Sequence, residues 1–211
     1  MVRILGISGS PRKAATYYAV EEALKAAAET GGVETDFISL KGKKINFCLH
    51  CDYCLRNKSY CLQKDDMTEI IDRMAAADGF IIGSPVYEGS MSGQLKTMLD
   101  RLRPMYMVYD NGLRNKVGGA IAVGGDRNGG VESTIKGIMD FYHIFEVITV
   151  GGIAPGGNFG GTVWSQDRRA QGAKDDLNGM ETVRKLGRRV ADVTKLIHGR
   201  TSEGVSAGDA T

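Results

Sequence analysis

The sequence predicts an α/β fold in which a doubly wound, five-stranded parallel sheet carries helices on both faces. Short apolar runs, of the kind found in strands buried on both sides, alternate with segments of helical periodicity, and this alternation indicates a parallel sheet. The second strand, residues 33–40, instead alternates apolar and polar side chains as a half-exposed edge strand does. An edge position for this strand favours the strand order 2-1-3-4-5.

The first half of the chain contains three of these strands. Residues 2–8 (VRILGIS) predict a buried strand, and the apolar residues of 16–30 recur at the i, i+3, i+4 and i+7 spacing of a helix. After the edge strand, residues 65–78 show the same helical spacing. Residues 79–85 (GFIIGSP) form the third predicted strand, again apolar enough to be buried on both faces.

The second half continues the alternation. Residues 90–102 predict a helix for which Ser90 is the expected N-cap, because a serine hydroxyl can accept a hydrogen bond from the first helical turn. Residues 117–125 and 145–152 predict the last two buried strands, with a helix over 132–143 between them.

One domain accounts for most of the chain. We expect residues 1–198 to form a single domain with a cysteine-rich loop at 41–65, and residues 199–211 to be a flexible tail. A glycine-rich loop at 151–161 leads towards the last helix, near 178–198. Residues 104–116 are too apolar for a free loop, so we expect them to contact a ligand or a partner subunit.

The charge and hydropathy of the chain exclude several function classes. Its 211 residues carry 27 basic and 25 acidic side chains, a net charge of +2, and the short KGKK run at 41–44 is typical of a solvated loop. No stretch of ~18 apolar residues could span a membrane, and the N-terminal apolar run is too short for a signal peptide. We therefore expect a cytoplasmic protein without nucleic-acid or membrane partners, in a reducing setting that disfavours disulfides.

Three turns rich in glycine and serine follow the first, third and fourth predicted strands. They lie near residues 8–18 (the first turn), 84–93 (the second turn) and 124–130 (the third turn). In open α/β sheets, ligands bind beyond the carboxyl ends of the strands, where the strand order reverses. Because the fold brings these turns to that edge, we expect a binding site there.

The first turn suits an anion. It ends at a helix N-terminus, where free backbone N–H groups and the helix dipole favour negative charge. Ser8, Ser10 and Thr16 add hydroxyl donors, while Arg12 and Lys13 add positive charge. A phosphate monoester fits this turn, and the alternative is an ordinary strand-to-helix turn with a capping serine. Neither G-x-G-x-x-G nor G-x-x-x-x-G-K-[ST] occurs here, which excludes the dinucleotide fingerprint and the P-loop.

The other two turns suit a flat polar ring. Pro85, Val86 and Tyr87 offer a stiff backbone edge and an aromatic face, although a single tyrosine is more often a core or surface residue. The glycines of the third turn let the backbone approach a planar ligand closely. Together with the first turn, these features predict a site for a planar ring that carries a phosphate.

All four cysteines lie between residues 48 and 61, in the pattern C-x2-C-x2-C-x6-C. Redox-active thiols, a zinc site and an iron–sulfur cluster are each compatible with this run. Zinc modules usually place two C-x-x-C pairs well apart, whereas three cysteines at one tight interval are typical of the ferredoxin run around a [4Fe–4S] cluster. Cys61 would then be the fourth ligand, and His50 is expected to lie beside the site rather than in it.

Three segments together resemble the NADPH-dependent FMN reductase family. They are GISGSPRKAATYY, the cysteine run followed by KDDM, and GSPVYEGSMSGQLKTMLDR, and the cysteine run is most similar to the iron–sulfur flavoprotein branch. The resemblance covers about residues 1–150 and implies a flavodoxin-like fold, tightly bound FMN, and a homodimer or homotetramer. Ala14 and Ala15 depart from the family, which often has a glycine–asparagine pair there, so any asparagine contact to the ligand is absent.

The resemblance also assigns roles to residues. It places the FMN phosphate on the first turn, the isoalloxazine ring on the second and third turns, and a [4Fe–4S] cluster on the cysteines. The expected cofactor-binding residues are Ser8, Ser10, Arg12, Lys13, Thr16, Tyr17, Pro85, Val86, Tyr87, Glu88, Gly124, Gly125, Asp126 and Gly130. The expected metal ligands are Cys48, Cys51, Cys54 and Cys61. No side chain is nominated as an acid–base catalyst.

The sequence thus predicts an FMN-dependent, iron–sulfur oxidoreductase. A cluster carries single electrons and a flavin accepts one or two, so the pair would couple a one-electron donor to a small-molecule acceptor. The resemblance implies ferredoxin as the donor, and family precedent places the cluster of one subunit near the FMN of another. Three alternatives stay open: an NAD(P)H-dependent flavin or quinone reductase without a cluster, an FMN dehydrogenase of a biosynthetic ring intermediate, and a zinc-stabilised redox-sensing or binding module.

Overall fold

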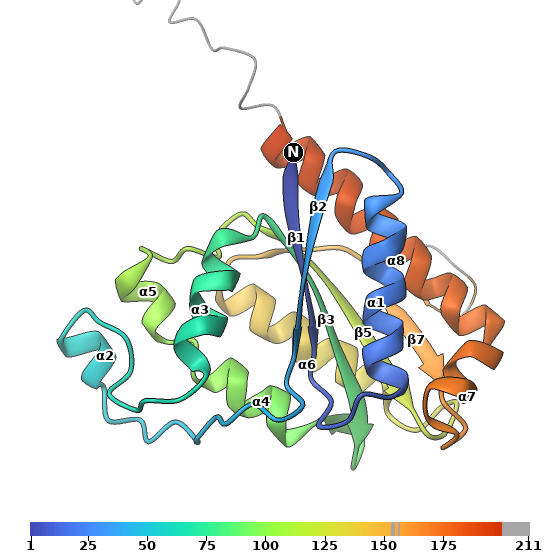
Figure 1. Cartoon of the computed structure of the whole chain (residues 1–211), viewed down its shortest axis with the longest axis horizontal. Helices are drawn as coiled ribbons and strands as arrows, with labels where there is room; N and C mark the ends of the chain where they lie inside the picture. Colours follow the sequence, from blue (N-terminus) through green and yellow to red (C-terminus); the bar gives the residue numbers. More distant parts are fainter. Residues whose placement is uncertain (153–154, 156, 200–211) are drawn as a thin grey trace, which may run out of the picture.

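A parallel sheet forms the centre of the molecule. The computed structural model describes residues 1–152, 155 and 157–199, so the predicted tail lies outside the described residues from residue 200 onwards. The strand order is β2-β1-β3-β5-β6, and every neighbouring pair on this path is parallel (Figure 1). These strands are β1 (Val2–Ser8), β2 (Val33–Ser39), β3 (Gly79–Tyr87), β5 (Val117–Gly124) and β6 (Ile148–Thr149). The predicted fold class and strand order are confirmed.

Two short strands that the sequence analysis did not predict complete a seven-stranded sheet. β4 (Ser90–Met91) pairs antiparallel with the end of β3. β7 (Gly161–Trp164) pairs parallel with β5 over Ile121–Gly124. The prediction of five strands is therefore wrong in number, although the order of the five along the main path holds.

The predicted strand over 145–152 is wrong in extent. Only β6 joins the sheet, beside the start of β5, and β7 takes the place next to the remainder of β5. Phe145 and Val147 are nevertheless buried, in a segment that follows α6 (Val131–Ile144) and precedes β6. Their apolar character reflects burial against the core rather than pairing in the sheet, and the sequence pattern does not separate these two causes.

Helices cover both faces of the sheet, as Figure 1 shows. One apolar core lies between the sheet and α1, α7 and α8, and a second lies between the opposite face and α3, α4, α5 and α6. The bounds of these helices are α1 (Ala15–Ala28), α3 (Met67–Ala76), α4 (Gly93–Asp100), α5 (Pro104–Val108), α6 (Val131–Ile144), α7 (Arg169–Asp175) and α8 (Leu177–His198). A single turn, α2 (Tyr53–Arg56), lies within the cysteine loop.

One local prediction is wrong, and a short helix within residues 104–116 was not predicted. Ser90 is not the N-cap of α4, because β3 runs on to Tyr87 and the chain turns back through β4 before the helix begins. Ser92 is the cap, and its hydroxyl accepts a hydrogen bond from the backbone N–H of Leu95 at 3.2 Å. Residues 104–116 are not all loop, since they begin with α5, in which Met105 is buried and Tyr106 stacks on Phe145 at 4.7 Å between ring centroids.

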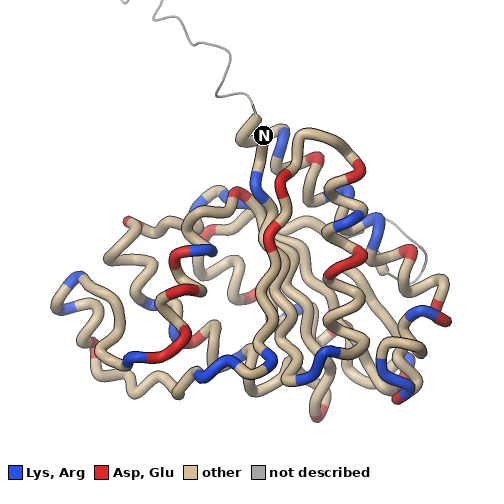
Figure 2. Tube along the Cα trace, in the orientation of Figure 1, with Lys and Arg blue, Asp and Glu red and all other residues tan. Residues whose placement is uncertain are grey.

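Charges of both signs are interspersed along the described chain (Figure 2). Within the same residues, no helix combines the length and the apolar character needed to cross a membrane. Most ion pairs are solvent-exposed, and pairs of that kind contribute little to stability. The pair between Arg101 and Asp65 differs, because the two side chains are only 1% and 2% exposed.

Helices α1 and α8 approach closely at Gly187, which gives a test of the packing. A Cβ atom added there would lie 2.1 Å from the backbone oxygen of Ala23, which cannot move without shifting α1. We expect Gly187→Ala to lower the free energy of unfolding by about 1–3 kcal/mol through overpacking. Urea unfolding measures this, with Gly93→Ala as the control, because an added Cβ at Gly93 meets no atom within 4 Å. Equal stability of the two variants would contradict the close approach.

Candidate functional site

The three turns meet at the carboxyl edge of the sheet. Ser92, which ends the second turn, donates its hydroxyl to the backbone oxygen of Gly9 in the first turn at 2.6 Å. Ser133 of α6 donates to the backbone oxygen of Gly89 at 2.6 Å and so joins α6 to the second turn. At Gly130, where φ is 99°, an added Cβ would lie 2.7 Å from Gly89, so a glycine is needed for this close approach of the third turn to the second.

A pocket of about 90 Å³ lies between these turns. It is lined by residues of the first and second turns, one glycine of the third turn, and a segment that follows β7. The lining residues that the sequence analysis named are Ser10, Arg12, Thr16, Pro85, Val86, Tyr87 and Gly125. Ala14 and Ala15 also line it, and their small side chains leave the start of α1 accessible.

The N-terminus of α1 has the features of an anion-binding site. Its N-cap residue is Ala14, no side chain caps the helix, and the first helical turn carries no acidic residue. The first-turn N–H groups therefore have no capping side chain, and the helix dipole is not offset there. The buried hydroxyl of Ser8 has no hydrogen-bond partner among the described residues. Leaving such a group unpaired costs free energy, so a phosphate that accepts hydrogen bonds at this turn fits the residues present.

Several predicted residues lie outside the pocket lining. Lys13 places its Nζ atom 4.7 Å from the ring centroid of Tyr17, and Tyr17 in turn packs edge-on against Phe37 of β2 at 4.6 Å. Both side chains are thus engaged with each other and with the edge strand. The other predicted residues outside the lining are Ser8, Glu88, Gly124, Asp126 and Gly130, which belong to the three turns around it.

One wall of the pocket was not predicted from the sequence, and it comes from the segment after β7. Ser165, Asp167 and Arg169 line the pocket there. The Ser165 hydroxyl and backbone N–H both bind the backbone oxygen of Gly124, at 2.9 and 2.8 Å. A Cβ at Gly125 would lie 2.6 Å from Asp167 Oδ1, so the glycine lets this segment close on the third turn. Polar residues after a strand at this edge are a recognisable signal, but it was not used because β7 was not predicted.

Trp164 does not line this pocket. Its ring lies beneath the guanidinium of Arg127, 4.5 Å from the ring centroid, and its backbone N–H donates to Asp176 at 2.8 Å. These contacts give Trp164 a packing role within this chain.

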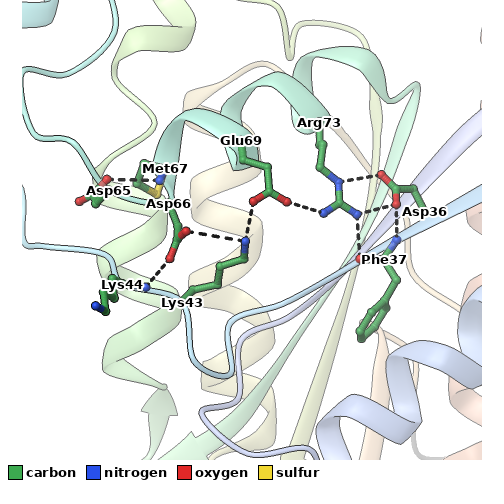
Figure 3. A network of polar contacts seen from close by, with 9 residues as sticks. All are labelled: Asp36, Phe37, Lys43, Lys44, Asp65, Asp66, Met67, Glu69 and Arg73. Atoms are coloured by element: carbon green, nitrogen blue, oxygen red, sulfur yellow. Dashed lines mark hydrogen bonds and ion pairs between the residues drawn. The ribbon is translucent and has the colours of Figure 1, made fainter.

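The cysteine loop leaves the same edge of the sheet, after β2, and its two ends are joined. The backbone N–H of Lys44 donates to Asp66 Oδ2 at 2.6 Å, and the backbone N–H of Asp66 donates back to the carbonyl of Lys44 at 3.1 Å. Figure 3 shows the surrounding network, in which Lys43 binds Glu69 of α3 and Arg73 binds Asp36 of β2. The stem of the loop is thus tied to α3, and α3 is in turn tied to β2.

Arg101, immediately after the last residue of α4, binds residues near both ends of the cysteine loop. Its Nη1 atom donates to the backbone oxygen of Asn46 and to Asp65 Oδ2, both at 2.7 Å, and its Nη2 atom donates to Asp65 Oδ1 at 3.0 Å. Asp65 also accepts from the backbone N–H of Asn46 at 3.1 Å. One buried guanidinium therefore binds both ends of the cysteine loop.

A second anchor lies next to the last cysteine. The hydroxyl of Tyr60 donates to Asp72 of α3 at 2.5 Å, and the hydroxyl of Tyr109 meets both groups, at 2.9 and 2.8 Å. Burial, together with the Asp72 carboxylate, raises the pKa of Tyr60 above its ordinary value. Tyr60 therefore remains a hydrogen-bond donor over the usual pH range and fixes the chain beside Cys61.

The four cysteines match an iron–sulfur cluster in their chemistry, since thiolates are the usual ligands. Cys54 is buried, Cys51 is exposed, and Cys48 and Cys61 are half-buried. In the part of the chain that the structure describes, no three or more His, Cys, Asp or Glu side chains are gathered as a ligand set. Burial raises the pKa of the Cys54 thiol, although Arg103 acts to lower it.

A cleft of about 810 Å³ adjoins the cysteine loop. Cys48 and His50 lie on one wall, and Lys96, Asp100 and Arg103 add charges of both signs. Its apolar lining comes from α4, α5, α6 and the residue after α6, namely Leu99, Tyr106, Phe141, Ile144 and Phe145. The cleft therefore gives one cysteine and His50 access to a surface large enough for a ring or for a partner's side chains.

Comparisons with known proteins show what this chain is similar to. The family model for NADPH-dependent FMN reductase matches residues 2–160. An iron-sulfur flavoprotein of Methanocaldococcus jannaschii is 48% identical over 194 residues, covering 92% of this chain and 98% of that protein. An iron-sulfur flavoprotein of Archaeoglobus fulgidus is 45% identical over 196 residues, covering 93% and 99%. The solved structure of a flavodoxin, WrbA-like protein from Agrobacterium tumefaciens has a TM-score of 0.65 at 17% identity, with 93% and 99% coverage, which supports the fold alone.

The buried ion pair predicts how stability depends on pH. Burial acts to raise the pKa of Asp65, but hydrogen bonds from Arg101 and from backbone N–H groups lower it on balance. The ionised Asp65 therefore contributes its full stabilisation at pH values above the ordinary carboxyl pKa of ~4. This stabilisation is lost as the pH falls through the lowered pKa of Asp65. We expect Asp65→Asn to cost about 3–5 kcal/mol at pH 7, because a buried guanidinium is left unpaired.

Urea unfolding at pH 7 and pH 3 measures this difference, and Asp36→Asn is the matched control. Asp36 also binds an arginine, but its side chain and that of Arg73 are 34% and 29% exposed, so we expect a loss of about 1 kcal/mol or less. On acidification the Asp65 variant should lose less stability than the wild type. Equal losses at pH 7 in both variants would show that burial of the Asp65 pair does not matter.

Proposed function

Since this chain belongs to the NADPH-dependent FMN reductase family, we propose that it is an iron–sulfur flavoprotein that passes electrons from a ferredoxin-like donor to a small acceptor. The proposal depends most on one observation: the phosphate-compatible first turn and the cysteine loop leave the same edge of the sheet, after adjacent strands β1 and β2. The relatives named iron-sulfur flavoproteins support the cluster, and the family match supports FMN.

FMN would bind in the pocket between the turns. The uncapped start of α1, with Ser10, Thr16 and Arg12, would hold the phosphate. Tyr87 and the backbone of Pro85 and Gly125 would border the ring. Arg169 adds a second positive charge to the lining and would help to neutralise the phosphate dianion.

The cluster would be held by Cys48, Cys51, Cys54 and Cys61. When bound, the cluster supplies single electrons and FMN accepts one or two, so together they connect one-electron and two-electron chemistry. The protein holds the cysteine loop by the ties at its stem, by Arg101 and by Tyr60. These ties set where the sulfur atoms lie relative to the sheet edge.

A second copy of the chain would complete the site. Phe47 and Leu49 of the cysteine loop are 76% and 69% exposed, and Leu62 and Tyr53 of the same loop are also exposed. Neighbouring apolar side chains that face solvent are typical of an interaction surface. Phe47 and Leu49 flank Cys48, which lines the cleft, and this supports a homodimer or homotetramer in which the cysteine loop of one subunit faces the flavin of another.

A second candidate is an NAD(P)H-dependent flavin reductase whose cysteines hold no cluster. The description of the family itself favours NADPH as the electron donor. The open side of the pocket at Tyr87, which is partly exposed, leaves one face for such a donor. Stopped-flow mixing with NADPH distinguishes the two, because fast bleaching of the flavin supports this candidate.

Anaerobic purification tests the cluster. We expect a brown protein with iron, acid-labile sulfide and FMN, whose absorption changes on reduction with dithionite. Changing any one of the four cysteines to serine should remove most of the iron and sulfide but leave FMN bound, because the two sites use different residues. FMN without iron and sulfide in the wild type would reject the cluster, and a colourless protein containing zinc would support a zinc-stabilised module instead.

Ser8 gives a prediction that separates ligand binding from folding. Because its buried hydroxyl has no partner in the ligand-free protein, Ser8→Ala should leave the stability of that form unchanged or slightly higher. FMN affinity should fall by about 10- to 100-fold, the loss of one hydrogen bond to a charged group. Fluorescence titration of the apoprotein measures it. The control is Thr134→Val in α6, which removes another buried, unpartnered hydroxyl that belongs to none of the three turns and should not change FMN affinity.

A further inference from the structure

Arg101 binds both ends of the cysteine loop, and one of its three side-chain nitrogen atoms makes no hydrogen bond within the described residues. Its Nη atoms bind Asp65 and the backbone of Asn46, but its buried Nε atom has no hydrogen-bond partner among the described residues. A buried donor without an acceptor costs free energy, and the cost is larger when the group is charged. An acceptor that binds this fixed, charged donor would therefore stabilise the protein, and the ligand-free chain does not supply one.

The sulfur of Cys61, four residues before the Asp65 that Arg101 binds, is one acceptor near the guanidinium. Burial acts to lower the pKa of Arg101, but Asp65 and Cys61 raise it on balance, so this thiol lies within electrostatic reach of the guanidinium. The side-chain amide of Gln63 lies 4.0 Å from the same sulfur atom. Cys61 thus lies among N–H donors and a permanent positive charge.

We propose that Arg101 is a positioning residue for the cluster, in which its Nε–H donates to the sulfur of Cys61 while its Nη atoms hold the ends of the loop. The inference rests on the proposed function, since it needs Cys61 to be a cluster ligand. N–H groups that donate to cluster sulfurs and nearby positive charge both raise the reduction potential, because reduction adds negative charge. Arg101 would therefore keep the cluster easier to reduce.

Lysine cannot reproduce this geometry. It can keep the charge and pair with Asp65, but it lacks the planar fork in which two nitrogens bind Asp65 and Asn46 while a third is left for another acceptor. Arg101→Lys therefore removes the N–H···S contact while sparing the buried carboxylate. Arg73→Lys is the matched control, because Arg73 of α3 binds Asp36, Glu69 and the backbone of Phe37 (Figure 3) and no cysteine.

An anaerobic redox titration followed by EPR tests the proposal on the intact flavoprotein. We expect Arg101→Lys to lower the midpoint potential of the cluster by the equivalent of about tenfold in the reduction equilibrium, which is ~59 mV for one electron. The control should keep the wild-type potential. A wild-type potential in Arg101→Lys, with a full complement of iron and sulfide, would overturn the inference and leave the proposed function standing.

A second measurement uses the wild type alone, in case the variant does not retain its cluster. Protein labelled with ¹⁵N-arginine and reduced should show nitrogen hyperfine coupling to the cluster in pulsed EPR. The same sample of Arg103→Lys should retain the coupling, which assigns it to Arg101 rather than to the arginine near Cys54. Absence of any arginine coupling would overturn the inference, and a wild-type protein without iron and sulfide would overturn the proposed function together with it.

Discussion

Parallel pairing of β1 with its two neighbours is the constraint on which the rest of the structure depends. Ser8, the last residue of β1, is level with Ser39 of β2 and Gly83 of β3. Ile4, Leu5 and Ile7 are fully buried and point to both faces, so a shift of one residue would exchange the two cores. The register is therefore fixed, and the first turn, the cysteine loop and the second turn must begin at one edge.

The cysteine loop is stabilised differently from the rest of the domain. Its larger apolar side chains, Phe47 and Leu49, face solvent, so it has little core of its own. A buried ion pair, Arg101 with Asp65, takes that role, supported by exposed pairs that contribute little individually. Ion pairs in the interior recover their desolvation penalty only with good geometry. The pair is thus better understood as fixing the position of the loop than as adding net stability.

The sequence predicted the elements whose patterns are local, and failed where distant residues decide. Beside β1, β2 follows from an apolar–polar alternation and β3 from an apolar run, and both strands are confirmed. Two serines, Ser90 and Ser92, are equally suited to cap α4, and the choice is made by the pairing of β4 with β3. β7 is only four residues long and follows a glycine-rich segment, so the pocket wall that includes Arg169 was missed. Arg101 reads as an exposed helical arginine, because its burial depends on Asp65, which is distant in sequence.

Helix α4 connects the two candidate sites. At its N-terminus Ser92 binds the backbone of Gly9 in the first turn, and immediately after its C-terminus Arg101 binds both ends of the cysteine loop. Its eight residues span about 12 Å, at 1.5 Å per residue. Leu95 and Met98 are fully buried, so the helix cannot rotate or slide without disrupting the core on that face of the sheet. The separation between the phosphate-compatible turn and the cysteine loop is therefore set by one packed helix rather than by the loop itself. A loop with so few buried apolar contacts can thus keep a defined position relative to the pocket.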